Sequence, residues 1–196
     1  MCQWLVVSLC GVTNGGKSTL MKELLKVLPD STKFLCQDNY FYPEDSSHHI
    51  PCPGSLKHHN WDIISAVDME KMKLDVRNII NSTPCNSNSS IQTYRPILLL
   101  DGFLLFDDSE LTAMCDLRYF ITLSREQCWE RRKNRNYDPP DPPGYFDLCV
   151  WPMYEEHLDR VKKTVAEVIF LDGTKWWLEA VSQQILELAK IKPTYK

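Results

Sequence analysis

The stretch Gly11-Val12-Thr13-Asn14-Gly15-Gly16-Lys17-Ser18, followed by Thr19, decides the fold. It matches the pattern G-x-x-x-x-G-K-[ST] in full. Glycines let such a loop wrap a phosphate closely, so that consecutive backbone N–H groups point inward. The helix that follows adds its positive N-terminal end. The stretch therefore predicts a nucleoside triphosphate site, in which Lys17 bridges the β- and γ-phosphates and the Ser18 hydroxyl ligates Mg²⁺.

The sequence on either side of the loop supports this interpretation over the alternative, a glycine turn with a chance lysine. Residues 4–10 are almost continuously apolar, which is typical of a strand buried on both faces. Residues 17–28 carry apolar side chains at helical spacing, and Pro29-Asp30 ends the pattern. The loop thus lies between a strand and a helix, as a phosphate-binding loop must.

Strands and helices alternate along the rest of the chain. Apolar, β-friendly segments predict strands at 33–36, 97–100, 119–123 and 165–171. Helical periodicity predicts helices over 62–80 and 176–191, and Ser124 is placed to cap a helix that runs towards Asn134. The alternation predicts an α/β fold, a doubly wound parallel sheet of five strands, in a single domain over residues 1–196.

Three segments lack these patterns. Residues 37–61 are rich in Pro, His, Ser and aromatic side chains and predict a long loop, which in a compact domain is usually functional. Residues 81–94 are polar, and we expect a mobile connection there. Residues 136–152 hold five prolines and Gly144, so we expect no regular helix. We expect a lid at about residues 131–153.

Composition excludes several classes of protein. The net charge of −4 argues against a nucleic-acid binder. No apolar run reaches the roughly 18 residues of a membrane span, and the N-terminus lacks the features of a signal peptide. The eight cysteines are scattered without a C-x-x-C pair, which favours free thiols in a reducing compartment. We therefore expect a cytoplasmic protein, and a monomer.

Two carboxylates are predicted at the ends of strands. Asp38 follows the second strand, at the edge where doubly wound sheets bind ligands. There it can accept the proton of an attacking hydroxyl and lie near Mg²⁺. Asp101 ends the run 97–100, in the pattern of an acid that orders Mg²⁺ or its waters. The alternatives are a capping or turn residue for Asp38, and a strand-terminating Asp-Gly turn for Asp101.

A basic cluster precedes the proline-rich segment. Arg131, Arg132 and Arg135 fall at helical spacing. Arginines on a lid can neutralise charge on a transferred phosphoryl group, while the lid excludes water. Alternatively they form a solvated helix face that pairs with Glu126 and Glu130. Spacing alone does not separate these interpretations.

Several segments together resemble the nicotinamide riboside kinases, in the uridine-kinase-like branch of P-loop kinases. The resemblance spans about residues 4 to 190 and is carried by residues 11–19, 37–43, 61–62, 101–106, 131–137, 142–147, 150–154 and 171–175. The resemblance is specific because it includes two long and unusual strings, Asp-Gly-Phe-Leu-Leu-Phe at 101–106 and Pro-Gly-Tyr-Phe-Asp at 143–147.

The resemblance implies transfer of the ATP γ-phosphoryl group to the 5′-hydroxyl of nicotinamide riboside, giving nicotinamide mononucleotide for NAD synthesis. It implies that Asp38 is the general base and that Lys17 holds the phosphates. The implied Mg²⁺ positions are Ser18, Asp38 and Asp101. The implied ATP positions are Gly11, Val12, Thr13, Asn14, Gly15, Gly16, Lys17, Ser18, Thr19, Arg131, Arg135, Asp172, Gly173 and Thr174. The implied nucleoside positions are Asp38, Asn39, Tyr40, Phe41, Trp61, Asp62, Arg132, Tyr137 and Asp138.

Elementary chemistry suits these implied roles. Pyridinium is flat and cationic, so Trp61 and Tyr137 can sandwich it through cation–π attraction, although Trp61 by itself predicts core packing. Asp62, with Arg132 alongside, can accept hydrogen bonds from the ribose hydroxyls.

Three positions depart from the family pattern. Asn39 stands where a second acid is common, and Asp101 stands where Glu is expected, so Asp101 would reach Mg²⁺ only through water. Asp138 replaces an uncharged residue near the pyridine substituent. We hypothesise that Asp138 disfavours nicotinic acid riboside, whose carboxylate it would repel.

Other functions remain open at this stage. A uridine or other nucleoside kinase is the nearest alternative, and a nucleotide-binding interaction protein without turnover is another. A GTPase would need an Asn-Lys-x-Asp string, which the sequence lacks. Four histidines at 48, 49, 58 and 59 flank Cys52 and raise the idea of a metal site, but their spacing fits no zinc pattern.

Overall fold

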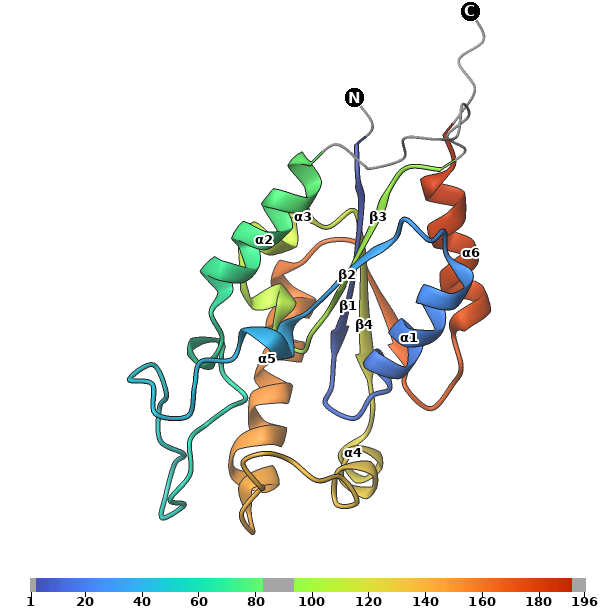
Figure 1. The fold of residues 1–196 in the computed structure, drawn as a ribbon. Helices are drawn as coiled ribbons and strands as arrows, with labels where there is room; N and C mark the ends of the chain where they lie inside the picture. The colour runs from blue at the N-terminus through green and yellow to red at the C-terminus, as the bar shows by residue number, and fades with distance from the viewer. Residues whose placement is uncertain (1–2, 83–93, 192–196) are drawn as a thin grey trace, which may run out of the picture.

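Five parallel strands form the sheet of the computed structural model, which describes residues 3–82 and 94–191 (Figure 1). Their order across the sheet is β2-β3-β1-β4-β5, and each neighbouring pair is parallel. The strands are β1 (Leu5–Gly11), β2 (Lys33–Cys36), β3 (Ile97–Asp101), β4 (Leu117–Thr122) and β5 (Val168–Asp172). The predicted five-stranded parallel sheet is confirmed.

Helices cover both faces of this sheet. In Figure 1, α1 and α6 lie on one side and α2, α3 and α5 lie on the other, with α4 beyond the strand ends. The helices are α1 (Lys17–Val27), α2 (Met69–Asn81), α3 (Ser109–Met114), α4 (Arg125–Arg132), α5 (Trp151–Thr164) and α6 (Leu178–Ala189). The arrangement is doubly wound, as the alternation of elements predicts.

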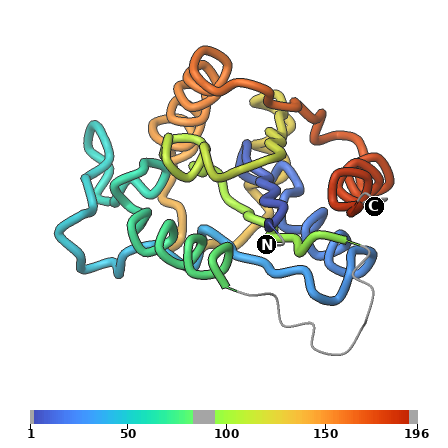
Figure 2. The backbone as a smooth tube through the Cα atoms, turned by 90° about the horizontal axis from the view of Figure 1, so that it is seen from above, coloured from blue at the N-terminus to red at the C-terminus, as the bar shows by residue number. Residues whose placement is uncertain are grey.

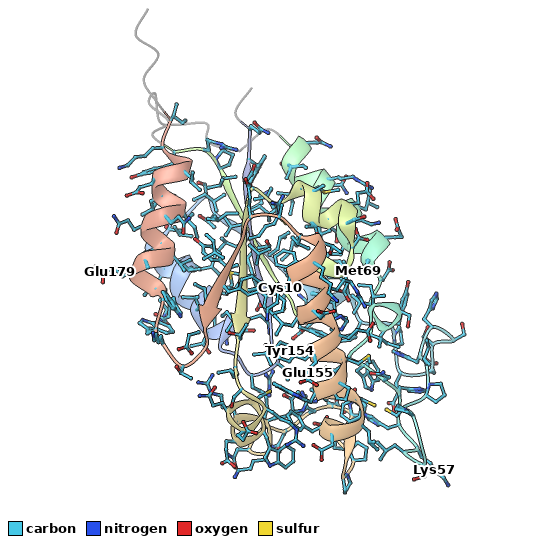
Figure 3. All side chains as sticks on the ribbon, turned by 180° about the vertical axis from the view of Figure 1, so that it is seen from behind. Cys10, Lys57, Met69, Tyr154, Glu155 and Glu179 are labelled. Carbon is cyan, nitrogen blue, oxygen red and sulfur yellow. The ribbon has the colours of Figure 1, made fainter. Side chains whose placement is uncertain are left out.

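Side chains of β1 pack into two separate hydrophobic cores, one on each face of the sheet. Alternate residues Leu5, Val7 and Leu9 pack with α1 and α6, whereas Val6 and Cys10 pack towards α2 and α5. Successive strand residues point to opposite faces, so a strand buried on both sides must be apolar throughout. Figure 3 shows Cys10 at the centre of the molecule, whereas Lys57 stands at the outer tip of a loop.

The carboxyl ends of the strands meet at one edge. Asp101 pairs with Leu9 of β1 and with Cys36 of β2, so the loops after these three strands start side by side. The segment between β2 and α2 lies at this end of the sheet in Figure 1, and the cyan part of the tube in Figure 2 shows that it projects sideways from the body. This edge is where open α/β sheets bind ligands.

Two predicted boundaries are wrong for identifiable reasons. The helix expected over 62–80 begins only at Met69, because the Asp68 side chain accepts a hydrogen bond from the Lys71 N–H and caps α2 there. The prediction of no regular helix over 136–152 fails at its end. A π-helix occupies Phe146–Val150 and runs directly into α5, and Pro152 is the second residue of α5.

Two helices, α3 and α5, were not predicted. The polar connection expected at 81–94 lies outside the described residues, except for its ends. Among the helices that the structure describes, none is long and apolar enough to cross a membrane.

Candidate active site

The phosphate loop leaves the carboxyl end of β1 at a position that only glycine can occupy. A Cβ atom on Gly11 would overlap the backbone of Ile121 on β4, and the φ angle of Gly11 is +123°. Gly16, with a φ angle of +95°, forms the N-cap of α1. The loop therefore turns tightly against β4 and leads directly into the positive end of the helix.

Lys17 folds back over this loop. Its ammonium group donates hydrogen bonds to the carbonyl oxygens of Gly11, at 2.9 Å, and Val12, at 2.8 Å. A phosphate oxygen is a stronger acceptor than a neutral carbonyl. The lysine is thus held at the mouth of the loop, where it can exchange these contacts for a phosphate.

Ser18 and Asp101 form a pair of oxygen donors beside the loop. The Ser18 hydroxyl donates a 2.7 Å hydrogen bond to Asp101 Oδ2. Asp101 is 2% exposed, and its Oδ1 atom has no hydrogen-bond partner among the described residues. Burial raises the pKa of Asp101, against the opposing effects of Lys17 and Ser18. A buried, unpartnered carboxylate oxygen next to a hydroxyl fits Mg²⁺, which prefers oxygen ligands.

Asp38 lines the same cavity as the phosphate loop and belongs to a 3₁₀ turn (Gln37–Tyr40) that follows β2. The neighbouring Gln37 is buried, and its side-chain oxygen accepts hydrogen bonds from the N–H groups of Phe103, at 3.0 Å, and Leu104, at 2.9 Å. Gln37 thereby ties the turn that carries Asp38 to the segment after Asp101. No local sequence pattern predicts this role of Gln37.

The arginines of the basic cluster contact the phosphate loop directly. Arg131 donates to the carbonyl oxygens of Asn14, at 3.1 Å, and Gly173, at 2.9 Å. Arg135 reaches the Asn14 side chain at 3.3 Å. The cluster is therefore not merely a solvated helix face, because two of its members bridge the loop and neighbouring segments.

Arg132 is the buried member of the cluster. Its guanidinium makes a two-pronged ion pair with Asp141, at 2.7 and 3.0 Å, and also donates to the Thr13 hydroxyl. Its Cζ atom lies 4.1 Å from the ring centroid of Tyr137, whose hydroxyl bonds to the Asn14 side chain. Such a bidentate pair fixes the guanidinium plane.

Trp61 and Asp62 approach the same cavity from the loop after β2. The half-buried Trp61 ring lies edge-on to Phe41, at 5.6 Å, and tilted against His49, at 4.2 Å. It therefore both packs and lines the cavity. Burial raises the pKa of Asp62, while the charge of Arg132 and a hydrogen bond from Tyr145 act in the opposite direction.

These groups surround one cavity of about 730 Å³, which is large enough for a nucleoside and part of a nucleotide. The predicted residues that line it are Thr13, Asn14, Gly15, Gly16, Lys17, Ser18, Thr19, Asp38, Phe41, Trp61, Asp62, Asp101, Arg131, Arg132, Arg135, Tyr137 and Asp138. A smaller hollow of about 280 Å³ adjoins the phosphate loop and is lined by Gly173, Thr174, Trp176 and Trp177, among others.

The remaining predicted residues lie outside the cavity wall. Gly11 and Val12 are buried beneath the loop. Asn39 is exposed, and Tyr40 is buried with its hydroxyl bonded to Asp75 at 2.9 Å. The Asp172 side chain accepts hydrogen bonds from the Thr174 N–H and hydroxyl, so it shapes the loop after β5.

Several residues that line the cavity are not among the predicted site residues. They include Glu44, Phe103, Asp141 and Tyr145. The Pro-Gly-Tyr-Phe-Asp string already contained Tyr145, but only as a mark of resemblance.

The histidines do not gather into a metal site. His49 Nε2 lies 2.9 Å from the Pro43 carbonyl oxygen, and its ring stacks on His59 at 5.0 Å. Across the part of the chain that the structure describes, no group of three or more His, Cys, Asp or Glu side chains is placed to hold a metal ion. Instead, His49 and His59 pack against Trp61, His48 stacks on Tyr42, and His58 lies edge-on to Tyr145.

The chain is similar to known kinases over most of its length. No protein-family model matches it. Nicotinamide riboside kinase 1 of Homo sapiens is 39% identical over 198 residues, covering 95% of each chain. Nicotinamide riboside kinase 2 of Homo sapiens is 37% identical over 189 residues, covering 93% of this chain and 80% of that one. The chain belongs to the nicotinamide riboside kinase family.

The chain also shows more distant similarities, one in sequence and two in structure. The uridine kinase of Chlamydia pneumoniae is 24% identical over 181 residues, covering 83% of this chain and 80% of that one. A possible uridine kinase from Bacillus stearothermophilus matches in structure with a TM-score of 0.54 and 15% identity, covering 86% of this chain and 90% of that one. Shikimate kinase from Acinetobacter baumannii matches with a TM-score of 0.52 and 14% identity, covering 94% and 92%. The structural matches show a shared fold alone.

Proposed function

We propose that this chain transfers the γ-phosphoryl group of ATP to the 5′-hydroxyl of nicotinamide riboside, giving nicotinamide mononucleotide. The observation that carries the proposal is the single cavity that joins the phosphate loop to Asp38, Trp61, Asp62 and Tyr137. Membership of the nicotinamide riboside kinase family supports it independently.

The donor half of the cavity suits ATP. The loop N–H groups and the N-terminus of α1 receive the phosphates, and Lys17 replaces its bonds to Gly11 and Val12 with bonds to phosphate oxygens. Ser18 and Asp101, with Asp38 nearby, are the residues that would hold Mg²⁺, which would supply positive charge to the β- and γ-phosphates. Arg131 and Arg135, anchored on Asn14, stabilise the negative charge of the transferred group.

The acceptor half suits a cationic nucleoside. The pyridinium ring lies against Trp61, which lines the cavity together with Tyr137. The Tyr137 ring already has the Arg132 and Arg135 guanidinium groups 4.1 and 5.1 Å from its centroid, so Trp61 supplies the main stacking surface. The Asp62 carboxylate accepts hydrogen bonds from the ribose hydroxyls. Asp38 accepts the proton of the 5′-hydroxyl as its oxygen attacks the γ-phosphorus and the bond to ADP breaks.

Product analysis tests this proposal. The protein is incubated with Mg²⁺, ATP and nicotinamide riboside, with uridine in a parallel reaction, and products are separated by chromatography and identified by mass. We expect nicotinamide mononucleotide and ADP in equal amounts. Uridine phosphorylation without nicotinamide riboside phosphorylation would favour the second candidate, a uridine kinase, which the relative in Chlamydia pneumoniae supports. No transfer to either nucleoside would contradict both.

A further inference from the structure

The segment formed by Trp61 and Asp62 is held by two residues from a distant part of the chain. The Tyr145 hydroxyl accepts a 2.9 Å hydrogen bond from the Trp61 backbone N–H and donates a 2.8 Å hydrogen bond to Asp62 Oδ2. His157 Nε2 lies 3.1 Å from the Asp62 carbonyl oxygen. The backbone on both sides of Asp62, and one oxygen of its carboxylate, are therefore fixed.

Both anchoring side chains are themselves rigidly placed. Tyr145 is buried directly before the π-helix Phe146–Val150, and His157 is buried on α5, which continues that helix. His157 Nδ1 lies 2.6 Å from Asp107 Oδ2, which also pairs with Arg160 at 2.9 Å. One continuous helical stretch thus reaches back to the loop that carries Trp61 and Asp62.

We propose that Tyr145 and His157 are positioning residues, which hold Asp62 and Trp61 in the geometry that receives the ribose and the base of the nucleoside. The inference rests on the proposed function for the role of Asp62 and Trp61. Tyr145 donates to one carboxylate oxygen only, so the other oxygen keeps its capacity to accept a ribose hydroxyl.

The chemistry of the Tyr145 hydroxyl explains why phenylalanine would not replace it. The hydroxyl acts as acceptor and donor at once, and without it the Trp61 N–H and the Asp62 carboxylate each lose a partner in a buried setting. The Tyr145 ring lies 5.8 Å from Arg132, which bonds to Thr13 of the phosphate loop, but Tyr145→Phe keeps that ring. The hydroxyl itself bonds only to Trp61 and Asp62 among the described residues. Loss of the hydroxyl should therefore weaken nucleoside binding and leave ATP binding intact.

Tyr154 provides a matched control on the same helical stretch. It is buried on α5, packs on Trp151 and Phe120, and its hydroxyl has no hydrogen-bond partner within the described ranges. Figure 3 labels it where α5 faces the sheet. Tyr145→Phe and Tyr154→Phe remove the same atom from the same kind of residue, but only the first breaks the anchor.

The experiment compares the KM values for nicotinamide riboside and for ATP in the wild type and these two variants. We expect Tyr145→Phe to raise the nucleoside KM roughly 10- to 100-fold, with the ATP KM within about twofold of wild type. Tyr154→Phe should change neither KM. Equal increases in both KM values for Tyr145→Phe, or no increase in the nucleoside KM, would overturn the inference.

A second readout separates positioning from folding. The hydrogen bond from Tyr145 favours the ionised form of Asp62 and so lowers its pKa. The charges of Arg132, Asp141 and His157 act on the same carboxylate. Without the hydrogen bond the pKa of Asp62 rises, so Tyr145→Phe should move the acidic limb of kcat/KM for the nucleoside to higher pH. Thermal unfolding of the variant at the same pH values shows where it stays folded, because a destabilised protein also loses activity in acid. Within the pH range where the variant is folded, an unmoved limb would contradict the inference. If Tyr145→Phe does not fold, His157→Gln and His157→Ala replace it. Gln, which keeps a donor, should retain nucleoside binding better than Ala, and equal losses would contradict the role of His157.

The two proposals fail in different ways. If the wild type phosphorylates uridine and not nicotinamide riboside, the proposed function fails, and the same comparison of variants is made with uridine. The positioning inference stands if Tyr145→Phe then raises the uridine KM selectively, and falls if it does not.

Discussion

The Ser18 hydroxyl donates a 2.7 Å hydrogen bond to Asp101 Oδ2, which joins the first helical turn after the phosphate loop to the end of β3. The two residues are 83 positions apart in sequence, and the register of β1 against β3 brings them together. The other oxygen of Asp101 is buried and lacks a partner in the described part of the chain. We infer that this pair is arranged for a cation that both side chains share.

Asp101→Asn should weaken the binding of Mg²⁺ without abolishing the binding of ATP. The amide removes the negative charge beside the ion, so we expect the Mg²⁺ concentration for half-maximal activity to rise about 10- to 100-fold. The measurement is a magnesium titration of initial rates at constant free ATP. Ser18 and Asp101 act as a pair. The double variant Ser18→Ala/Asp101→Asn should therefore lose less free energy of Mg²⁺ binding than the two single variants lose together. Strict additivity would contradict a shared ion.

Asp38→Asn should greatly slow phosphoryl transfer while the protein still binds ATP. The amide cannot accept the proton of the 5′-hydroxyl, and general bases contribute about 10²- to 10⁴-fold to rate. We expect kcat to fall by that factor, with ATP affinity, measured by calorimetry, within a few-fold of wild type. Asn39→Ala serves as the control, since Asn39 is exposed and outside the cavity wall. An Asp38→Asn variant with wild-type kcat would refute the catalytic assignment.

Asp138 is predicted to select between the amide and acid forms of the nucleoside. Its side chain lines the cavity, and a carboxylate there would repel that of nicotinic acid riboside. We expect Asp138→Asn to raise kcat/KM for the acid riboside by at least about tenfold, with little change for the amide. Equal kcat/KM values for both ribosides in the wild type would overturn this idea.

His157 should make stability depend on pH near neutrality. Burial lowers its pKa, but the contact and charge of Asp107 and the Asp62 carbonyl outweigh burial, so the folded-state pKa lies above the ordinary 6.5. Its contribution to the free energy of unfolding is thus complete below pH 6.5 and is lost as the pH rises through the higher folded-state value. Arg160 still pairs with Asp107 at high pH.

Thermal unfolding of the wild type and His157→Gln between about pH 5.5 and 8.5 checks this dependence. The difference in Tm between the two proteins should be largest at the acidic end and should shrink as the pH rises. A difference that grows with pH would contradict the assigned sign.

Gly11 should be irreplaceable for steric reasons. A Cβ atom there meets the Ile121 backbone, which cannot move without breaking β4 from β1, so we expect Gly11→Ala to cost more than about 3 kcal/mol of unfolding free energy. Gly54→Ala is the control, because Gly54 also has a positive φ angle but open space around it, and should cost about 1 kcal/mol. Chemical denaturation measures both, and equal costs would rule out the clash.

Sequence reasoning succeeds here where pattern and chemistry are local. The apolar run before the phosphate loop specifies β1, and the G-x-x-x-x-G-K-[ST] spacing places Lys17 and Ser18 without further information. The strand-end position of Asp38 and Asp101 follows from the parallel sheet, because the carboxyl ends of its strands share one edge.

Contacts between distant segments could not be predicted in this way. Gln37 has no local signature, since its role is to accept the N–H groups of Phe103 and Leu104 across the strand ends. Tyr145 likewise has no local sequence pattern that predicts its role, because its hydrogen-bond partners Asp62 and Trp61 lie 83 and 84 positions away. The start of α5 was missed because Pro152 reads as a helix breaker unless it falls in the first turn.

A crystal structure with nicotinamide riboside and a non-hydrolysable ATP analogue tests the central claim most directly. The measured quantity is the distance between the Asp38 carboxylate and the nucleoside 5′-oxygen. We predict about 2.6–3.2 Å, with the γ-phosphate on the far side of that oxygen in line for transfer. A carboxylate turned away from the γ-phosphate and beyond hydrogen-bond reach of the 5′-oxygen would contradict the account.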